Sequence, residues 1–488
     1  MPSVLRVPAW ATTGILTLCG LIVSLQQTLV IPLMPDMPQI LGVSADDASW
    51  LVTATLLAGA VSTPIVSRMA DMYGKRRMLL VALSVMTAGS LIAALGGGFL
   101  PLIAGRAMQG FGASLIPVGI SIMRDELPRE KLSGGISLMS ATLGIGAALG
   151  LPLSGVLYGA FGWTSLFWST AFVGAVLIVA IRLLINESPQ RSRGHFDVVG
   201  AIVLSVVLVG FLLALSKGSS WGWTSGRVIG LAALSAVALA VWVPLQLRVR
   251  EPMVNLRTAF RPPMLLTNVS SYFAGFAMFL NGLVTTQELQ VPEDTGYGLA
   301  LPVVTAGLAM VPSGLMMLCF SPVSGRMLDR WGGKPTLMTG ATVMGLTYLW
   351  RVFNSDTVLN VVLGNMFVSI GTAIAFAAMP ALVMASVPRS ETASANGLNT
   401  LVRSLGTSSG SAVVALVFAS LTVSVGGAVF PSGEAMELVH WLGVAVSLAS
   451  VLVGALIPTR GQRRDEEYGT IVTASGTGSA KESVGVRP

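Results

Sequence analysis

Residues 67–77 read Ser-Arg-Met-Ala-Asp-Met-Tyr-Gly-Lys-Arg-Arg, a short charged segment between two long apolar runs. A related segment at residues 325–334 reads Gly-Arg-Met-Leu-Asp-Arg-Trp-Gly-Gly-Lys. Asp329 in the second copy follows Asp71 in the first at an offset of 258 residues. Two such copies, each joining two apolar runs and standing about half a chain apart, predict a protein built from two homologous halves.

The repeat continues in nearly the same register beyond these segments. Matching residues keep an offset of 259 or 260: Gly105-Arg106 with Gly364-Asn365, Pro128-Arg129 with Pro388-Arg389, and Gly146 and Gly150 with Gly406 and Gly410. Two six-helix repeats with two helices between them are an architecture of secondary transporters.

The composition is that of a membrane protein. Of the 488 residues, 53% are hydrophobic and 10% are charged, whereas a soluble domain carries about 25% charged residues. Apolar segments of roughly 20 residues recur along the chain, which predicts spanning helices rather than a barrel. We expect fourteen spans, at about 9–33, 48–67, 78–97, 99–120, 134–157, 164–185, 198–216, 227–247, 264–287, 300–322, 336–353, 358–380, 393–424 and 436–457.

The net charge of +7 indicates topology rather than nucleic-acid binding. With the N-terminus placed inside, most of the 29 lysines and arginines fall on the inner side, as cytoplasmic loops require. An even number of spans returns the chain to its starting side, so we expect a multi-pass plasma-membrane protein with both termini cytoplasmic. The expected partners are the lipid bilayer, a small-molecule substrate and protons. Nothing in the sequence requires a dimer, and we expect a monomer.

The predicted spans divide the chain into four parts. Residues 1–185 form an N-terminal six-helix bundle, residues 186–263 a polar linker with two additional spans, and residues 264–457 a C-terminal six-helix bundle. Residues 458–488 are polar and rich in Gly, Ser and Thr, which predicts a disordered cytoplasmic tail. The predicted fold class is therefore an all-α integral membrane protein of fourteen transmembrane helices.

Four stretches together resemble the signatures of the major facilitator superfamily, specifically its fourteen-span drug:proton antiporter (multidrug efflux) branch. They are the segment around Asp71, the Arg-Ala-Met-Gln-Gly-Phe-Gly stretch at residues 106–112, the Gly-Ala-Ala-Leu-Gly-Leu-Pro-Leu-Ser-Gly stretch at residues 146–155, and Gly162-Trp163. With the number of spans, the resemblance covers nearly the full length. It implies a major-facilitator-type fold whose two bundles rock about a midplane cavity, and export of drugs in exchange for protons.

The resemblance makes the two charged segments a cytoplasmic gate. Its predicted residues are Asp71, Gly74, Lys75, Arg76 and Arg77 in the first copy and Gly325, Asp329 and Arg330 in the second. A carboxylate beside a helix N-terminus and basic residues can hold one state and release it in another. The alternative is a pair of basic loops that only set the orientation in the membrane.

Polar residues inside the spans are candidates for the proton or substrate pathway. They are Gln26, Gln27, Arg106, Gln109, Glu288 and Arg403. A buried arginine costs roughly 2.5–3.5 kcal/mol on insertion scales, so Arg106 in the fourth span needs partners or water. The resemblance implies a place in the proton pathway or facing the cavity. The alternative is a structural arginine bonded to backbone carbonyls, and Arg403 has the weaker functional argument of the two.

The first span departs from the family pattern at the residue that carries the proton. The drug:proton branch typically has Asp-x-Thr there, whereas this chain has Gln26-Gln27-Thr28. Glutamine cannot carry a proton near neutral pH. The remaining acidic candidates lie close to helix ends: Asp36 outside the first span, whose alternative is a solvated loop residue, and Glu288 near the outer end of the ninth span. His440 can titrate, but a lone histidine in a span is more often structural.

A helix-flexing motif is predicted in the fifth span from Gly146, Gly150, Pro152 and Gly155. The family pattern has Gly and Pro adjacent, and here Leu151 intervenes. The functional interpretation is a pliant helix that opens or seals the cavity. The alternative is ordinary packing of small residues between helices.

Together these features favour a secondary active transporter that exports amphipathic or cationic small molecules such as antibiotics, by proton antiport. One alternative keeps the fold but carries an anionic or zwitterionic solute, including by facilitated diffusion. Another is a non-transporting membrane sensor. The sequence has no nucleotide-binding loop, no recognisable catalytic set and no metal-ligand spacing, so we expect neither an enzyme nor a cofactor.

Overall fold

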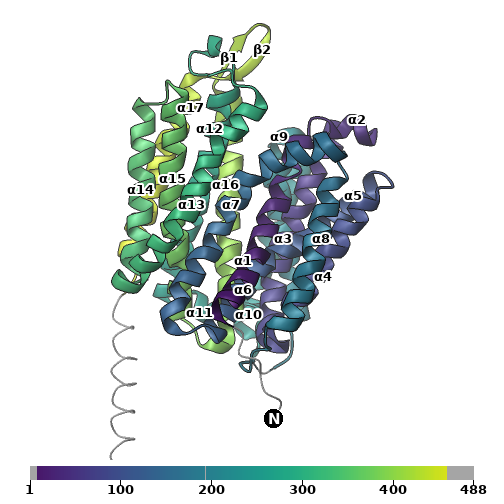
Figure 1. Ribbon diagram of the computed structural model, residues 1–488, viewed down its shortest axis with the longest axis vertical. Coiled ribbons are helices and arrows are strands. Elements are labelled where there is room, and N and C mark those ends of the chain that lie inside the picture. The colour runs from purple at the N-terminus through teal and green to yellow at the C-terminus, as the bar shows by residue number, and fades with distance from the viewer. Residues whose placement is uncertain (1–7, 193, 459–488) are drawn as a thin grey trace, which may run out of the picture.

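The computed structural model describes residues 8–192 and 194–458 of the chain, and this part is mostly helical (Figure 1). The predicted tail, apart from Pro458, lies outside the described residues. The helices of the first half are α1 (Ala9–Thr28), α2 (Met37–Leu41), α3 (Ala45–Tyr73), α4 (Lys75–Leu95), α5 (Phe99–Gly110), α6 (Leu115–Glu126), α7 (Arg129–Phe161) and α8 (Ser165–Leu184). Short 3-10 helices occupy η1 (Ile31–Leu33) and η2 (Phe111–Ser114).

Three helices follow before the second half: α9 (Val198–Trp221), α10 (Gly226–Arg248) and the short α11 (Leu256–Ala259). The second half contains α12 (Pro262–Gln290), η3 (Glu293–Thr295), α13 (Val303–Trp331), α14 (Gly333–Phe353), α15 (Val358–Ala385), η4 (Arg389–Glu391), α16 (Thr392–Ser420) and α17 (Gly433–Ala455). A hairpin of β1 (Thr422–Val425) and β2 (Ala428–Pro431) joins α16 to α17, with Thr422 paired to Pro431.

The fourteen predicted spans all correspond to helices, the fourth being α5, η2 and α6 in succession. Thirteen spans in the described chain are long and apolar enough to cross a membrane. The remaining predicted span is α14, which is 21 residues long and packs against α15 and α17. It is less apolar because it contains several Gly and Thr residues together with Lys334 and Arg351.

The prediction that the charged segments are loops between spans is wrong. Residues 67–73 complete α3 and residues 325–331 complete α13, so both helices continue past the predicted span ends. The chain breaks at single glycines, Gly74 with φ 120° and Gly332 with φ 81°. Such positive φ angles suit glycine because it has no Cβ. The charged side chains are therefore held on rigid helix ends.

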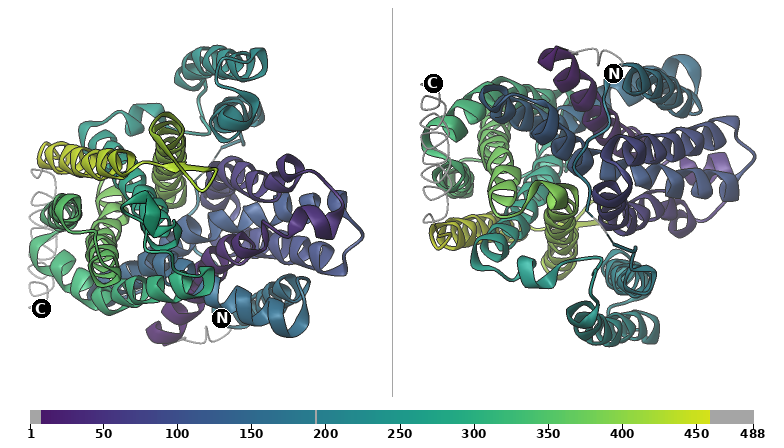
Figure 2. Two further views of the ribbon diagram at one scale, coloured as in Figure 1. Left: turned by 90° about the horizontal axis from the view of Figure 1, so that it is seen from above. Right: turned by 90° about the horizontal axis from the view of Figure 1, so that it is seen from below.

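The helices gather in two groups (Figure 1). Helices α3, α4, α5 and α8 lie on one side, and α12, α14, α15 and α17 on the other. Contacts between the groups come from α7, which packs on both α1 and α13, and from α16, which packs on both α12 and α3. Helices α9 and α10 stand outside both groups, where α9 packs on α3 and α16 (Figure 2).

The internal repeat is visible in equivalent close contacts between helices. In the first half, a Cβ placed on Gly105 of α5 would lie 2.5 Å from the carbonyl oxygen of Gly89 on α4. In the second half, a Cβ on Gly340 of α14 would lie 2.6 Å from the carbonyl oxygen of Gly371 on α15. Glycine therefore allows the third and fourth helices of each half to approach closely, as small residues do in membrane proteins.

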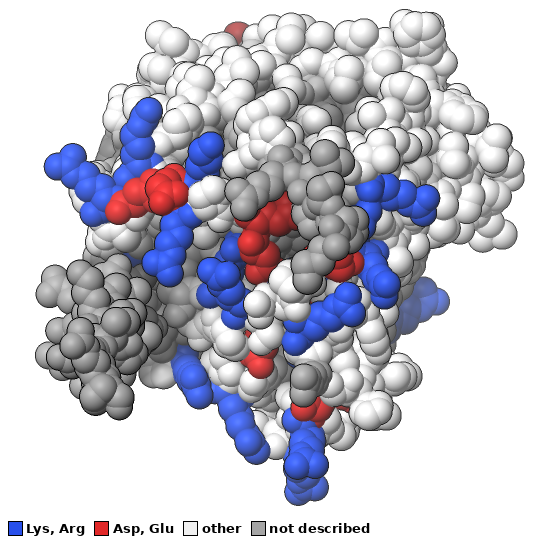
Figure 3. Space-filling view, turned by 60° about the horizontal axis from the view of Figure 1, so that its bottom comes forward, with Lys and Arg blue, Asp and Glu red and all other residues white. Residues whose placement is uncertain are grey.

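One end of the molecule is rich in basic side chains (Figure 3). We call it the basic end; it includes Lys75, Arg124, Arg182 and Arg389, and α1 starts there. The opposite end, the far end, carries η1, η3 and the β1–β2 hairpin and lies at the top of Figure 1.

Candidate functional site

Asp71, in the last turn of α3, joins the two halves at the basic end. Its side chain is buried, and its Oδ1 accepts a hydrogen bond from the backbone N–H of Ala393 at 3.0 Å. Its Oδ2 accepts from the N–H and the hydroxyl of Ser394, each at 2.7 Å. Both N–H groups belong to the first turn of α16, where free donors and the helix dipole favour a negative charge. The carboxylate thus caps a helix of the other half.

Two further cations of the first half reach the same region. The buried Lys75 forms an ion pair with Asp125 at 2.5 Å and donates to the carbonyl oxygen of Arg389 at 3.4 Å. Arg124 donates to the hydroxyl of Thr392 at 2.7 Å and to the carbonyl oxygen of Val387 at 3.2 Å. These contacts surround the start of α16.

The hydrogen bonds between helices α1–α8 and helices α12–α17 within the described chain all lie in the basic half of the molecule. Asp71, Lys75 and Arg124 form all but one of these hydrogen bonds. In the remaining one, the hydroxyl of Ser140 donates to the carbonyl oxygen of Phe376 at 3.1 Å. Ser140 lies in the fourth turn of α7, which starts at the basic end. The hydrogen bonds between the two halves are therefore concentrated toward the basic end, whereas the packing of α7 on α13 extends farther along the helices.

The other residues of the first predicted gate segment, Gly74, Arg76 and Arg77, contact residues 186–192, which we call the linker segment. The backbone N–H groups of Arg76 and Arg77, at the start of α4, donate to the carboxylate of Glu187 at 3.1 Å each. A Cβ on Gly74 would lie 2.8 Å from the same carboxylate. The hydroxyl of Ser188 donates to Asp125 at 2.6 Å, so the linker segment also contacts the ion pair of Lys75.

The second predicted gate segment has a different environment. Gly325 is buried where α13 meets α7, and a Cβ there would lie 3.2 Å from the Cα of Gly134. Asp329 and Arg330 are exposed, and neither has a side-chain hydrogen bond or an ion pair to any described residue. The gate role of these residues stays a prediction, and the two copies of the motif differ in their contacts.

Arg106 on α5 is buried, with 1% of its surface exposed, and its partners are neutral. Its Nε donates to the carbonyl oxygen of Leu51 at 2.9 Å, and its Nη1 donates to the carbonyl oxygen of Gln26 at 3.2 Å and to Oε1 of Gln109 at 2.8 Å. No carboxylate of the described chain lies within 4.0 Å of it. Carbonyl and amide dipoles therefore solvate this charge.

The two glutamines complete this cluster, which we call the Arg106 cluster. Gln26 donates through Nε2 to the carbonyl oxygen of Gln109 at 2.8 Å, and its buried Oε1 has no hydrogen-bond partner in the described structure. Gln109 donates through Nε2 to the hydroxyl of Ser90 on α4 at 2.8 Å. Three of the predicted pathway residues, Gln26, Arg106 and Gln109, are thus brought together. Gln27 is half-buried and is not part of the cluster.

A second buried arginine, Arg351 on α14, was not predicted as a site residue. It lies two residues before the end of α14, but none of its surface is exposed. Its Nη2 forms an ion pair with Oε2 of Glu288 on α12. Its Nη1 donates to Oδ1 of Asn281 at 2.7 Å and to the hydroxyl of Thr285 at 3.0 Å. Asn281 in turn donates to Oδ1 of Asn365 on α15 at 2.6 Å.

His440 on α17 completes this second cluster, which we call the Arg351 cluster. Its Nε2 lies 3.3 Å from Oε1 of Glu288, and neither atom makes a hydrogen bond to a described residue. Glu288, predicted from its place near the end of a span, is therefore both buried and paired. The spacing of Asn281, Thr285 and Glu288, at i, i+4 and i+7, is the sequence signal that indicates one polar face of α12.

Residues 16–411 match the family model described as Major Facilitator Superfamily. The chain belongs to the Major Facilitator Superfamily. Proteins of this superfamily are multi-pass membrane transporters of small molecules, which agrees with the many spans described above.

Several relatives of this superfamily member are named for drug resistance. The chain is 29% identical to the multidrug resistance protein Stp of Mycobacterium tuberculosis, over 79% of this chain and 72% of that protein. It is 28% identical to the tetracenomycin C resistance and export protein of Streptomyces glaucescens, over 88% of this chain and 79% of that protein. It is 26% identical to the lincomycin resistance protein LmrB of Listeria monocytogenes, over 75% and 76%.

Solved structures of the superfamily share the fold. The human organic anion transporter MFSD10 matches with a TM-score of 0.64 at 14% identity, over 92% of this chain and 100% of that one. The proton:xylose symporter XylE matches with a TM-score of 0.63 at 14% identity, over 93% and 97%. The predicted fold class and family are confirmed by these comparisons.

The remaining predicted site residues of this superfamily member lie apart from the two clusters. Arg403 on α16 is buried, and its guanidinium lies 4.8 Å from the ring centre of Phe376. A cation over an aromatic face is attracted by the ring quadrupole. No carboxylate of the described chain lies within 4.0 Å of Arg403.

The glycines of α7 pack against α1. A Cβ on Gly146 would lie 2.3 Å from Cβ of Ser24, and one on Gly150 would lie 1.9 Å from Oγ1 of Thr28. Gly155 has open space around it, and α7 continues through Pro152 without a break. Two of the four residues therefore have a packing role, and the flexing of α7 stays a prediction.

Proposed function

We propose that this protein exports amphipathic or cationic small molecules, antibiotics among them, by alternating access in exchange for protons. The observation that carries the alternating-access part of the proposal is the position of the hydrogen bonds between the two halves. They lie in the basic half of the molecule. A transporter that opens alternately to each side needs contacts that close one end and can break. The names of the relatives support the class of substrate.

In this proposal the basic end faces the cytoplasm, because cytoplasmic loops collect Lys and Arg. The structure then corresponds to a state that is closed to the cytoplasm. Separation of α3 from α16 would remove three hydrogen bonds from Asp71 and expose the first turn of α16. The same motion opens the basic end to a substrate from the cell interior.

Glu288 is the proposed proton carrier. It is a buried carboxylate within a span, and its Oε1 lacks a hydrogen bond while its Oε2 faces Arg351. Binding of a proton would remove the charge that attracts Arg351 and so release the ion pair. Gln26, at the position of the branch's usual aspartate, cannot perform this step.

The test is drug efflux from proteoliposomes with and without an imposed pH gradient. We expect wild-type efflux to follow the gradient, Glu288→Gln to lose the gradient dependence, and Arg106→Ala to lose efflux. Glu434→Gln is the matched control, because Glu434 lies exposed in the first turn of α17, and it should behave as wild type. Efflux that ignores the gradient in the wild type would refute proton coupling, and absence of efflux for every drug tested would refute export.

A second candidate function is transport of an anionic or zwitterionic solute. The observation that favours it is the pair of buried arginines, Arg106 and Arg403, which have no carboxylate of the described chain nearby. A cation that is solvated only by dipoles attracts an anionic group. Efflux of an anionic dye that competes with, or replaces, that of a cationic dye in the same vesicles would favour this function.

A further inference from the structure

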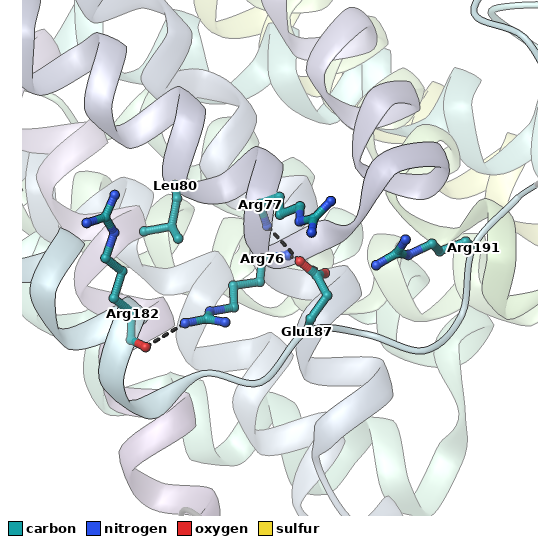
Figure 4. Close-up of a pocket in the computed structure, with 6 residues that line it drawn as sticks. All are labelled: Arg76, Arg77, Leu80, Arg182, Glu187 and Arg191. Carbon is teal, nitrogen blue, oxygen red and sulfur yellow. Dashed lines mark hydrogen bonds between the residues drawn. The ribbon is translucent and has the colours of Figure 1, made fainter. Parts of the chain in front are cut away.

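A pocket opens at the basic end beside the start of α4 (Figure 4). It has a volume of about 520 Å³. Its lining residues are Arg76, Arg77 and Leu80 of α4, Arg182 of α8, and Glu187 and Arg191 of the linker segment. Four guanidinium groups and one carboxylate therefore surround one cavity, which gives its walls an excess of positive charge.

The single carboxylate of the pocket is already engaged. Glu187 accepts hydrogen bonds from the N–H groups of Arg76 and Arg77, so it compensates the positive end of α4. The guanidinium of Arg76 donates to the carbonyl oxygen of Arg182 at 2.5 Å. This leaves the guanidinium groups of Arg77, Arg182 and Arg191 without a carboxylate of the described chain within 4.0 Å.

The guanidinium groups of Arg77 and Arg191 suit an anion with several oxygens, and Arg182 adds positive charge at the other side of the pocket. Figure 4 shows Arg191 pointing from the linker segment toward Arg77 and Glu187, while Arg182 lies on the other side of Leu80. A guanidinium presents parallel donors that match phosphate oxygens, and it does so better than an ammonium group. A phosphate group is therefore the chemistry that the pocket fits.

The pocket borders an apolar surface. Next to it along the helices, Val81 of α4 and Val179, Leu183 and Leu184 of α8 are exposed. Leu80 carries this apolar character into the pocket wall. A ligand that fills the pocket and covers this surface has an anionic head and hydrocarbon tails. Basic pockets between spans on the cytoplasmic side bind anionic lipid head groups for the same reasons.

We propose that this pocket binds the phosphate of an anionic phospholipid, whose acyl chains lie along α4 and α8. The bound head group would bridge the linker segment to α4 and α8. The linker segment also contacts the gate, through Ser188 to Asp125 and through the N–H of Ser192, which donates to the carbonyl oxygen of Asp71 at 2.7 Å. The lipid therefore stabilises the arrangement in which the basic end is closed.

The experiment is lipid competition on the full chain in detergent, followed by native mass spectrometry. Equal amounts of phosphatidylglycerol and phosphatidylcholine with the same acyl chains are offered to the wild type, to Arg182→Gln/Arg191→Gln, and to Arg248→Gln/Arg250→Gln. The last pair is the matched control, because Arg248 and Arg250 are exposed at the basic end and do not line the pocket. Thermal unfolding of each sample with each lipid is recorded in parallel.

We expect the wild type and the control to retain phosphatidylglycerol and to be stabilised by it. The preference for phosphatidylglycerol should fall roughly tenfold or more in the pocket variant, since each basic residue at a membrane surface contributes attraction to anionic lipid. Equal retention of the two lipids by the wild type would overturn the proposal. This comparison uses the wild type alone and does not depend on whether a variant folds. An undiminished preference in the folded pocket variant would also overturn it.

A separate arm distinguishes the two sources of phosphate. Inorganic phosphate and glycerol phosphate are added without lipid at millimolar concentration. If either one stabilises the wild type as much as phosphatidylglycerol does, and the pocket variant loses that effect, the ligand is free phosphate and the lipid assignment is overturned. No stabilisation by either anion, with stabilisation by the lipid, supports the proposal.

Discussion

Each half buries one arginine that bonds to its first span, Arg106 and Arg351, but the two halves balance its charge differently. Arg106 in the first half is solvated by two backbone carbonyls and a glutamine oxygen. Arg351 in the second half faces the carboxylate of Glu288, with Asn281 and Thr285 on its other nitrogen. The Arg106 cluster thus has a net charge of +1, and the Arg351 cluster is neutral while Glu288 is ionised and His440 is not.

The two halves of the repeat share the packing of their helices but differ in the charged residues buried between them. Both halves retain the glycine contacts between their third and fourth helices. In the second half, however, the arginine has moved from the fourth helix to the third, and Asn365 stands where Arg106 stands in the first. A proton on Glu288 would give the second cluster the net charge that the first has permanently. Of the two clusters, only the Arg351 cluster contains groups that can bind a proton, the carboxylate of Glu288 and the imidazole of His440.

The largest expected effect comes from removing the carboxylate that distinguishes the Arg351 cluster. Glu288→Ala leaves a buried arginine without its counter-charge, and breaking such a pair costs about 3–5 kcal/mol in the free energy of unfolding. The double variant Glu288→Gln/Arg351→Gln should be closer to wild type, because no uncompensated charge remains. Thermal unfolding in detergent measures both. A double variant as unstable as Glu288→Ala would contradict this account of the pair.

A second prediction concerns two glycines at equivalent positions of the repeat, Gly105 and Gly364. A Cβ on Gly364 would lie 2.6 Å from Cδ of Arg351, whereas a Cβ on Gly105 would meet the backbone of Gly89. Alanine at either position should cost about 1–3 kcal/mol of stability through overpacking.

The two costs should respond differently to removal of the ion pair. In a Glu288→Gln/Arg351→Ala background, the cost of Gly364→Ala should largely disappear because Cγ and Cδ of residue 351 are absent. The cost of Gly105→Ala should stay unchanged in that background. Double-mutant cycles on the unfolding free energy give the coupling of each glycine substitution to removal of the ion pair. Equal coupling for Gly364→Ala and Gly105→Ala would contradict the prediction that only Gly364 packs against Arg351.

A third prediction uses the two aspartates of the repeated segment. Asp71→Asn removes a charged acceptor from the first turn of α16 and should favour opening of the basic end by about 1–2 kcal/mol. Asp329→Asn should have no such effect, because Asp329 is exposed.

The measurement is the distance between spin labels at positions 130 and 326, on the exposed basic ends of α7 and α13. The labelled protein carries serine in place of Cys19 and Cys319, because Cys319 is exposed. A population with a longer distance should increase in Asp71→Asn alone. The same increase in both variants would show that the two segments act alike.

The smallest expected effect comes from Lys217 on α9. This lysine is buried, but its partner Asp46 is 46% exposed, and their ion pair is 2.7 Å long. A pair with one member in solvent is worth at most about 1 kcal/mol. Lys217→Met should therefore lower the thermal midpoint only slightly. A loss as large as that of Glu288→Ala would mean that α9 is essential to the fold of the first half.

Most of the fold was predictable because apolar length and the repeat are properties of consecutive residues. The spans, their number and the burial of Arg106 follow from such patterns. The end of α3 was predicted wrongly because Arg68 and Asp71 interrupt the apolar run, and charged residues at the end of an apolar run are also typical of a loop. The helical conformation of residues 67–73 is stabilised by contacts with α16 and the linker segment, which lie far away in the chain.

The Arg351 cluster was the part of the candidate site that the sequence did not reveal. Arg351 lies two residues before the end of α14, where an arginine ordinarily extends toward the membrane surface. Its burial depends on partners from α12 and on the absence of a side chain at Gly364 of α15. The cluster forms where four helices meet in space. Within a single stretch of sequence, the polar face of α12 is the only sign of it.

Helix α9 touches both halves, but within residues 8–192 and 194–458 it forms hydrogen bonds with the first half only. On α3 it has hydrogen bonds from Lys217 to Asp46 and Ser49 and between Ser216 and Thr53. Against α16 its contacts are apolar, through side chains such as Leu208 and Leu401. Apolar contact has no preferred direction, so we expect α9 to move together with α3 and to let α16 shift against it. Of the two inserted helices, α9 would then be the one that stays in contact with both halves during the motion.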